Sequence, residues 1–183
     1  MPITKEVGYI PSLYTAKNNL HQGARAILRK TGDTICVSLP HSEEFAVAHQ
    51  NVYILKDKVG YSMLFWMGLL NSKLLSFLYQ NGLYGQKGRT MAQFRIYALN
   101  VLPFPQNINI KAIRDLENLV SILISNNDLI ERKYIECQID EIVYGMYGLT
   151  DTEIKIIEKV LFTAHLVFGD CNCQNSSLIY RNL

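Results

Sequence analysis

The sequence predicts an α+β fold: a twisted, mostly antiparallel sheet packed on a buried helix, followed by a helical C-terminal part. Three observations predict it. Segments rich in Ile, Leu, Val and Thr, separated by turn residues, lie between residues 25 and 56, which is the pattern of strands. A long apolar stretch follows at residues 61–79. From residue 110 onward, apolar residues recur at spacings of three and four, which indicates helices.

Three strands are expected in the first region. Arg25–Lys30 and Thr34–Leu39 are separated by the turn signal Thr31-Gly32-Asp33, and Phe45–Lys56 follows the break Pro40-His41-Ser42. Strands at this spacing are expected to form a meander. Three strands of this length need further strands or a covering helix for stability.

A single helix is expected over Tyr61–Tyr79, and it is apolar nearly all round in its first half. Such a helix is buried against a sheet. Glycines 82, 85 and 88 then mark a loop, and Pro103-Phe104-Pro105 ends the domain because prolines interrupt regular pairing. We therefore expect a domain at residues 1–105, a helical segment at 106–168 and a flexible tail at 169–183.

The helical segment is expected to begin with one long helix from Ile110. Its apolar face is interrupted only by Asn127 and consists of Ile113, Leu116, Val120, Leu123, Ile130 and Tyr134. About three heptads with one polar core position resemble a coiled-coil seam. We expect any self-association to use this stretch, Ile113–Tyr134.

Two further helices are expected. One spans about Gln138–Tyr147 and stops at Gly148, because glycine readily adopts the left-handed conformation that ends helices. The next begins at Thr150, with Glu153 three residues later, which is the capping-box pattern.

Composition limits the class of protein. Of the 183 residues 49% are hydrophobic and 19% charged, which suits a folded domain. The longest apolar run, Met63–Leu70, is too short to cross a bilayer. Four cysteines occur without a second pair that would complete a zinc site. We expect a reduced, cytoplasmic protein with no metal and no membrane partner.

The charge is unevenly distributed. Residues 1–100 carry eleven Lys or Arg against five Asp or Glu, a net charge of +6, whereas residues 101–183 carry seven against eleven, a net charge of −4. A basic half joined to an acidic half predicts that the first half meets a polyanion.

Catalytic motifs are missing from the sequence. The histidines lack metal-ligand spacing, and neither a Gly-x-Ser-x-Gly nor a Walker motif occurs. Glu131-Arg-Lys133 and Glu153-Ile-Lys155 match a nuclease Glu-x-Lys pair by letter only, in helical segments where solvated surfaces produce the same spacing. The sequence also lacks the cofactor loop and the Asn-Pro-Pro-Tyr-like motif of a DNA methyltransferase. We expect no catalytic site in this chain.

The loop at residues 82–95 is the most informative stretch. It is rich in glycine, free of acids, and carries Tyr84, Gln86, Lys87, Arg89, Gln93 and Arg95. Arg and Lys bind phosphates or guanine edges, and Gln pairs with adenine. The same composition also fits a solvated surface loop. The turn residues Arg29, Lys30 and Thr31 form a second candidate surface, with the same alternative.

The order of several motifs resembles a known family. Ile27-Leu-Arg-Lys-Thr-Gly-Asp33, Asn51-Val-Tyr-Ile-Leu-Lys56, Leu69-Leu-Asn-Ser-Lys-Leu-Leu-Ser-Phe77 and Leu102-Pro-Phe-Pro105 are similar to the TaqI-like C-terminal specificity domain. That domain is the target-recognition part of adenine-specific DNA methyltransferases and of fused type II restriction-modification enzymes. The helical stretch Ile139–Glu153 resembles the segment that closes many such enzymes.

The resemblance implies sequence-specific recognition of double-stranded DNA, with methyl transfer performed by a catalytic domain in cis or trans. That separate domain would bind S-adenosylmethionine. Within this chain the resemblance points to the loop 86–95 and to the strand ends around Arg29–Thr31. It implies that Asn71 and Ser72 are structural residues whose side chains bond to the backbone, while Lys73 could still reach a phosphate.

Two alternatives remain at this stage. One is a protein–protein interaction module or specificity subunit of a type I-like restriction system. The motif Leu-Leu-Asn-Ser-Lys also occurs in such specificity subunits. The other is a metal-dependent nuclease that uses Glu153 and Lys155.

Overall fold

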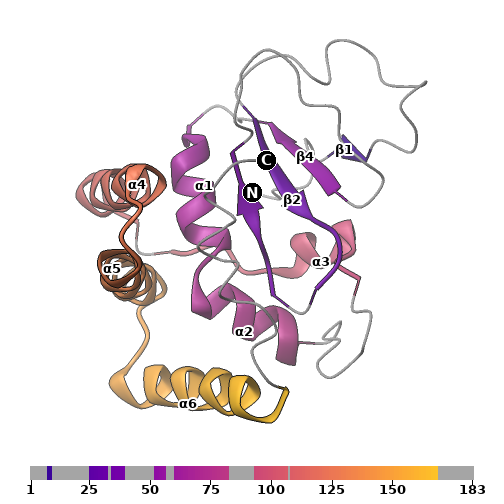
Figure 1. Cartoon of the computed structure of the whole chain (residues 1–183), viewed down its shortest axis with the longest axis vertical. Helices are drawn as coiled ribbons and strands as arrows, with labels where there is room; N and C mark the ends of the chain where they lie inside the picture. The colour runs from indigo at the N-terminus through magenta and orange to yellow at the C-terminus, as the bar shows by residue number, and fades with distance from the viewer. Residues whose placement is uncertain are drawn as a thin grey trace.

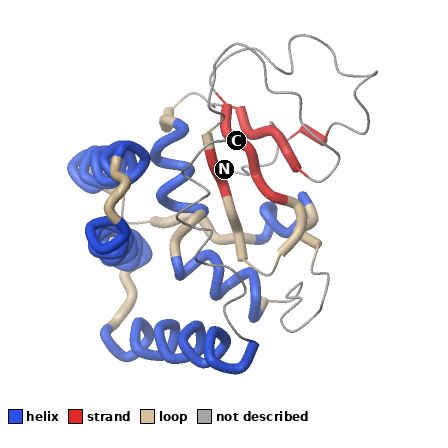
Figure 2. The backbone as a smooth tube through the Cα atoms, viewed as in Figure 1, coloured by secondary structure: helices blue, strands red, loops and turns tan. Residues whose placement is uncertain are grey.

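The computed structural model describes residues 8–9, 25–32, 34–39, 52–56, 60–82, 93–106 and 108–168. The described residues form one sheet and six helices, and most of the helices lie on one side of the sheet (Figures 1 and 2). This confirms the α+β class. The strands are β1 (Gly8–Tyr9), β2 (Arg25–Arg29), β3 (Val37–Ser38) and β4 (Val52–Lys56); the helices are α1 (Met63–Leu70), α2 (Lys73–Asn81), α3 (Ile96–Val101), α4 (Ile110–Ser125), α5 (Leu129–Tyr147) and α6 (Asp151–Phe168).

The sheet is antiparallel, with the strand order β1-β4-β2-β3. The predicted hairpin of β2 and β3 is present, but the predicted meander is wrong because β4 pairs with β2 rather than with β3. It pairs along the whole of β2, from Arg25 opposite Lys56 to Arg29 opposite Val52. A central place suits β4, whose middle residues 53–55 are all buried. The predicted strand residues 45–51 lie outside the described part of the chain.

The expected helix Tyr61–Tyr79 is instead two helices, α1 and α2, which break at Asn71 and Ser72. The Ser72 hydroxyl accepts a hydrogen bond from the Leu75 N–H at 3.3 Å and so caps the start of α2. It also donates to the Leu69 carbonyl at 2.7 Å, at the end of α1. One serine therefore satisfies backbone groups of both helices, which a periodicity argument does not reveal.

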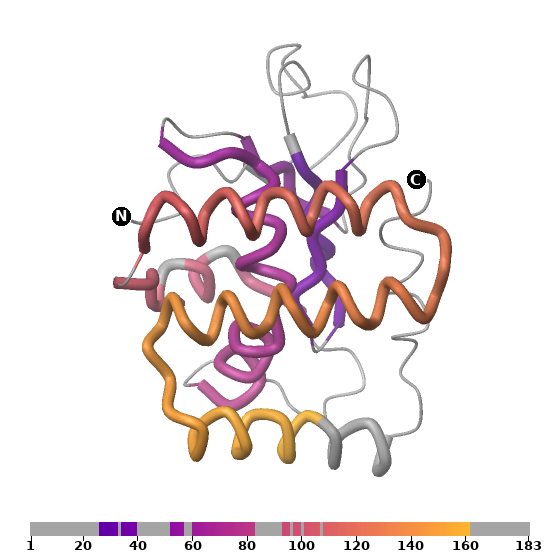
Figure 3. Tube along the Cα trace, turned by 90° about the vertical axis from the view of Figure 1, so that its left-hand side faces the viewer, coloured from indigo at the N-terminus to yellow at the C-terminus, as the bar shows by residue number. Residues whose placement is uncertain are grey.

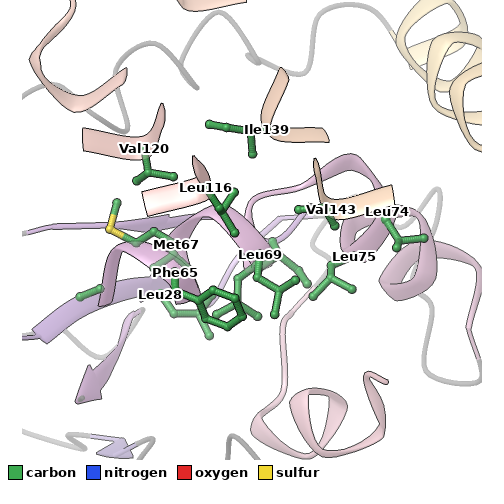
Figure 4. Close-up of a cluster of buried hydrophobic side chains, with 14 of the residues drawn as sticks. Leu28, Phe65, Met67, Leu69, Leu74, Leu75, Leu116, Val120, Ile139 and Val143 are labelled. Carbon is green, nitrogen blue, oxygen red and sulfur yellow. The ribbon is translucent and has the colours of Figure 1, made fainter. Parts of the chain in front are cut away.

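Helix α1 is apolar on all sides because it lies between two layers. It contacts β2 and β3 on one side and α4 on the other. Gly68 marks the closest approach to α4, since a Cβ there would lie 2.7 Å from Leu116 Cδ1 and 2.9 Å from Val120 Cγ2. Side chains from β2, α1, α2, α4 and α5 meet in this region (Figure 4). The absence of a side chain at Gly68 lets the C-terminal helices join the same core.

The expected long helix from Ile110 is also two helices, α4 and α5. They run side by side in opposite directions (Figure 3). The chain turns at residues 126–128, where the Asp128 carboxylate accepts from the N–H groups of Ile130 and Glu131 and caps α5. Asn127, the interruption of the apolar pattern, lies in this turn. Helix α5 thus begins at Leu129 instead of near Gln138.

The predicted seam is divided by this turn. Leu116, Val120 and Leu123 of α4 are buried in the core, whereas Ile130 and Tyr134 of α5 are 82% and 66% exposed. The six residues do not share one helix face. Self-association through Ile113–Tyr134 stays a prediction, and in this structure the exposed residues of the seam are on α5.

The two local signals at the end of the chain are confirmed. Gly148 ends α5 with φ 65°, in the left-handed region. Glu153 accepts from the N–H and the hydroxyl of Thr150, both at 2.8 Å, while the Thr150 hydroxyl accepts from the Glu153 N–H at 3.4 Å. This reciprocal pair is the predicted capping box at the start of α6. The predicted tail, 169–183, lies outside the described residues.

Buried hydrophobic residues of both halves form one continuous core. It runs from Ala26 and Leu28 of β2 through α1 and α2 to Ile157 and Leu161 of α6. The predicted boundary at residue 105 stays a prediction. At that point the Tyr147 hydroxyl of α5 donates to the Pro103 carbonyl at 2.7 Å, which fixes the proline segment to the helices.

Candidate functional site

The turn between β2 and β3 is held closed by the arginine that begins it. The Arg29 N–H donates to the Cys36 carbonyl at 2.9 Å. Its guanidinium folds back over Gly32, whose φ of 131° is a conformation that L side chains rarely adopt. The Nη2 atom donates to Thr34 Oγ1 at 3.5 Å. Arg29 therefore shapes the turn from within, because its side chain packs across the glycine.

A second segment, distant in sequence, is paired with this turn. Gln93 forms an antiparallel bridge with Thr31, and the Phe94 N–H donates to the Lys30 carbonyl at 2.6 Å. The Tyr53 hydroxyl of β4 donates to the Phe94 carbonyl at 3.3 Å. The pairing fixes Gln93 and Phe94 against the β2–β3 turn.

Phe94 anchors this junction to the core. Its side chain is 1% exposed, and its ring centroid lies 4.7 Å from that of Tyr79 in α2. Its neighbours Gln93 and Arg95 are both exposed. Alternation of exposed and buried residues is the geometry of an extended chain. It leaves the two polar side chains on the surface while the aromatic ring fills the core.

Five of the ten predicted DNA-contacting residues are thus brought together. We call Arg29, Lys30, Thr31, Gln93 and Arg95 the turn surface. In the sequence they form two separate candidate patches. The remaining predicted loop residues, Tyr84, Gln86, Lys87 and Arg89, lie outside the described residues, and their assignment stays a prediction.

The turn surface is basic in composition, because Arg29, Lys30 and Arg95 are cations and none of its five residues is acidic. The neighbouring Asp33 lies outside the described residues. Between residues 58 and 114 the sequence contains no Asp or Glu. The Lys30 ammonium lies 5.6 Å from the centroid of the Tyr53 ring, a cation–π distance. Arg95 is exposed and precedes α3 without making a side-chain cap. Such a surface favours an anionic partner.

Lys73, the other predicted contact, lies elsewhere. Its ammonium donates to both carboxylate oxygens of Glu158 at 3.0 and 3.1 Å and lies 3.5 Å from Asp140 Oδ2. The Lys73 N–H donates to Asp140 Oδ1 at 2.8 Å. The structure therefore gives Lys73 a role in joining α2 to α5 and α6. A phosphate contact by Lys73 stays a prediction.

Lys73, Asp140 and Tyr144 have perturbed pKa values. Burial lowers the pKa of Lys73, but the carboxylates of Asp140 and Glu158 outweigh burial, and its pKa lies above the ordinary value. Burial raises the pKa of Asp140 to about 6, against the opposing effect of Lys73. Burial and the same two carboxylates raise the pKa of Tyr144, whose hydroxyl donates to Glu158 at 3.0 Å. The cluster is a partly exposed ionic network between three helices, in which, of the three charged side chains, only that of Asp140 is nearly buried.

Asn71 and Ser72 are confirmed as structural residues that bond to the backbone. The Ser72 contacts lie within the α1–α2 break. The Asn71 amide instead reaches across to β3, where it accepts from the Val37 N–H and donates to the Val37 carbonyl. The tripeptide 71–73 thus contacts the sheet, the preceding helix and the C-terminal helices in turn.

Helix α3 was missed by sequence reasoning, and with it an exposed aromatic residue. Tyr97 is 43% exposed and lies two residues after Arg95. The missed signal is the pair Tyr97 and Val101, spaced by four residues between a basic residue and a proline segment. The helix has only six residues, which is too short for periodicity to detect.

The nuclease alternative gains no support from the described residues. Among them no group of three His, Cys, Asp or Glu side chains could hold a metal ion. Glu153 is engaged in the capping box with Thr150, whose N–H and hydroxyl lower its pKa.

Among the described residues, no helix combines the length and apolar character needed to cross a membrane.

A hairpin turn that gathers three cations and a glutamine amide on one surface, over a sheet braced by helices, suits recognition of an anionic partner. Residues 6–104 match the family model of the TaqI-like C-terminal specificity domain. The match covers more than half of the chain, and the chain belongs to this family. No curated protein matches the chain. Membership supports a DNA-recognition role in restriction-modification systems.

Proposed function

We propose that this chain recognises a specific site in double-stranded DNA on behalf of a restriction-modification methyltransferase, and carries no catalytic site itself. The observation that carries the proposal is the bridge between Thr31 and Gln93. It unites the β2–β3 turn with the end of the 82–95 loop. Two predicted contact segments more than sixty residues apart then form one surface.

The side chains of the turn surface have complementary roles in this proposal. Lys30 and Arg95 supply positive charge for phosphates, which dominate affinity but carry no sequence information. Gln93 has the donor and acceptor needed to pair with adenine N6 and N7 in the major groove. Arg29 holds the turn in shape. Loop residues Lys87 and Arg89 extend the phosphate contacts.

Catalysis belongs to a separate domain, in cis or in trans, which binds S-adenosylmethionine and transfers the methyl group. This chain contributes DNA contacts alone. With duplex DNA and S-adenosylmethionine, the chain by itself is expected to form no methylated adenine. Adding the catalytic domain should restore the reaction.

The direct test is binding of the 183-residue chain to a fluorescent pool of random-sequence duplexes, followed by selection of the preferred site. Arg95→Ala should weaken binding to all sequences and reduce the slope of log K against log salt by about 1. Gln93→Ala should weaken binding to the selected site while leaving the salt slope unchanged. Lys87→Ala and Arg89→Ala should weaken binding like Arg95→Ala.

Lys155→Ala is the matched control, because it removes an exposed cation from α6 and leaves the turn surface intact. It should bind like the parent chain. If Arg95→Ala and Lys87→Ala bind duplex DNA with the affinity of the parent chain, the assignment of the DNA-contacting residues is wrong. A parent chain that binds no duplex at all would contradict the proposed function.

A further inference from the structure

One face of α3 is exposed and apolar next to the turn surface. Ala98 and Leu99 are 4% and 1% exposed and fix the helix to the core. Tyr97 and Val101 are 43% and 57% exposed. Residues four apart lie on the same helix face. These two therefore form one ridge, directed away from the core.

The ridge continues the turn surface along the chain. Gln93 is bridged to Thr31, Phe94 points into the core, and Arg95 immediately precedes α3. The Ala98 N–H donates to the Arg95 carbonyl at 2.8 Å, so the helix starts directly at this arginine. From Arg95 to Val101 a helix rises about 9 Å. Because duplex DNA rises about 3.4 Å per base pair, this length corresponds to about three base-pair steps.

The charge around the ridge indicates which partner covers it. Arg95 precedes Tyr97, Lys30 lies at the adjoining turn, and the sequence from 58 to 114 contains no acid; Asp33 of that turn lies outside the described residues. An apolar ridge beside cations fits a polyanion that also presents apolar groups. Nucleic acid does so through deoxyribose and the thymine methyl group in the major groove. Among the described residues, the two side chains of the ridge are also far too few for a stable protein–protein interface, which buries about 800 Å² per partner.

We propose that Tyr97 and Val101 contact apolar groups of the duplex while Arg95 contacts the adjacent phosphate. This inference rests on the proposed DNA-recognition function and adds a determinant outside the loop and the hairpin turn. Tyr97 acts through its ring. Its contribution is independent of salt because it displaces no counterions from phosphate.

The test compares duplex binding by Tyr97→Ala, Tyr97→Phe and Val101→Ser across a salt series, using the random duplex pool and the selected site. Loss of an apolar base contact should weaken binding to the selected site about 5- to 50-fold, with an unchanged salt slope. Tyr97→Phe should bind within about twofold of the parent, because it keeps the ring. Ile156→Ser is the control, because it removes an apolar side chain that is 52% exposed on α6.

Each outcome separates the two proposals. Parent-like binding by Tyr97→Ala and Val101→Ser, with binding still lost in Arg95→Ala, would overturn the inference and leave the proposed function intact. A lower salt slope in Tyr97→Ala, or equal losses in Tyr97→Phe and Tyr97→Ala, would also overturn it. If the two variants instead abolish a dimer seen by sedimentation, a second copy covers the ridge and the inference fails. A parent chain that binds no duplex contradicts the function itself. Urea unfolding of each variant confirms that the fold is retained.

Discussion

The side-chain amide of Asn71 pairs with both backbone groups of Val37. Its Oδ1 accepts from the Val37 N–H at 2.7 Å, and its Nδ2 donates to the Val37 carbonyl at 2.8 Å. Val37 lies in β3, the edge strand that returns from the β2–β3 turn. One amide therefore substitutes for a neighbouring strand at this edge. The break between α1 and α2 thereby holds the strand behind the turn surface.

Asn71→Ala should lower the free energy of unfolding by about 2 to 4 kcal/mol, because two backbone groups of the fully buried Val37 lose their partner. The loss is measured by urea denaturation. Asn81→Ala is the control: Asn81 is exposed and makes a local bond to the Phe77 carbonyl. It should cost less than about 0.5 kcal/mol. Equal effects of the two substitutions would contradict the role of Asn71.

Gly68→Ala should destabilise the protein by about 1 to 3 kcal/mol, although alanine favours helices. The new methyl group would lie 2.7 to 2.9 Å from Leu116 and Val120, so α1 and α4 would have to separate. In α5, a Cβ added at Gly145 would meet no neighbouring side chain within 4 Å. Gly145→Ala should therefore stabilise by up to about 1 kcal/mol. Thermal unfolding of the two variants should shift in opposite directions.

Arg132→Met should cost about 2 to 4 kcal/mol. Arg132 is 2% exposed, and its Nη1 donates to the carbonyls of Leu123 and Asn126, at 2.6 and 2.7 Å, where α4 ends. Methionine fills similar space but leaves these carbonyls without that donor. The adjacent Lys133 is exposed. Lys133→Met should change stability by less than about 0.5 kcal/mol in the same denaturation experiment.

Asp140→Asn should flatten the pH dependence of stability between about pH 4 and 6. Burial raises the pKa of Asp140 from 3.8 to about 6, so the folded protein binds this proton more tightly than the unfolded chain. The stability due to this carboxyl is complete below about pH 4 and is lost as pH rises through about 6. Asparagine cannot titrate, yet its oxygen can still accept from the Lys73 N–H.

The free energy of unfolding, measured by urea denaturation at each pH, should show this loss as about 2 to 3 kcal/mol in the parent. Lys73, Glu158 and Tyr144 face the same cluster, and their pairing reduces the net effect. Glu141→Gln changes an exposed carboxyl on the same helix and should keep the parent profile. A parent profile in Asp140→Asn would contradict the assignment of this titration to Asp140.

Features that depend on a few neighbouring residues were predictable from the sequence. The β2–β3 hairpin follows from its turn residues, the stop at Gly148 from glycine, and the start of α6 from Thr150 and Glu153. The apolar character of α1 predicted its burial. The motif order also indicated the family, because it is a property of the chain alone.

Features that depend on partners distant in sequence were not predictable. No periodic signal in the sequence indicates that β4 lies beside β2 or that Thr31 pairs with Gln93. The same holds for the contacts of Lys73, whose partners are 67 and 85 positions away. Periodicity also cannot tell a polar core position from a turn, which is why the pattern predicts Asn127 inside a helix. The order of amino acids was enough to establish most of the segments that form strands and helices, though not α3 or the breaks at residues 71–72 and 126–128, and which family the chain belongs to. Packing established that two separate polar segments form one surface, because only the folded core around Phe94 brings them together.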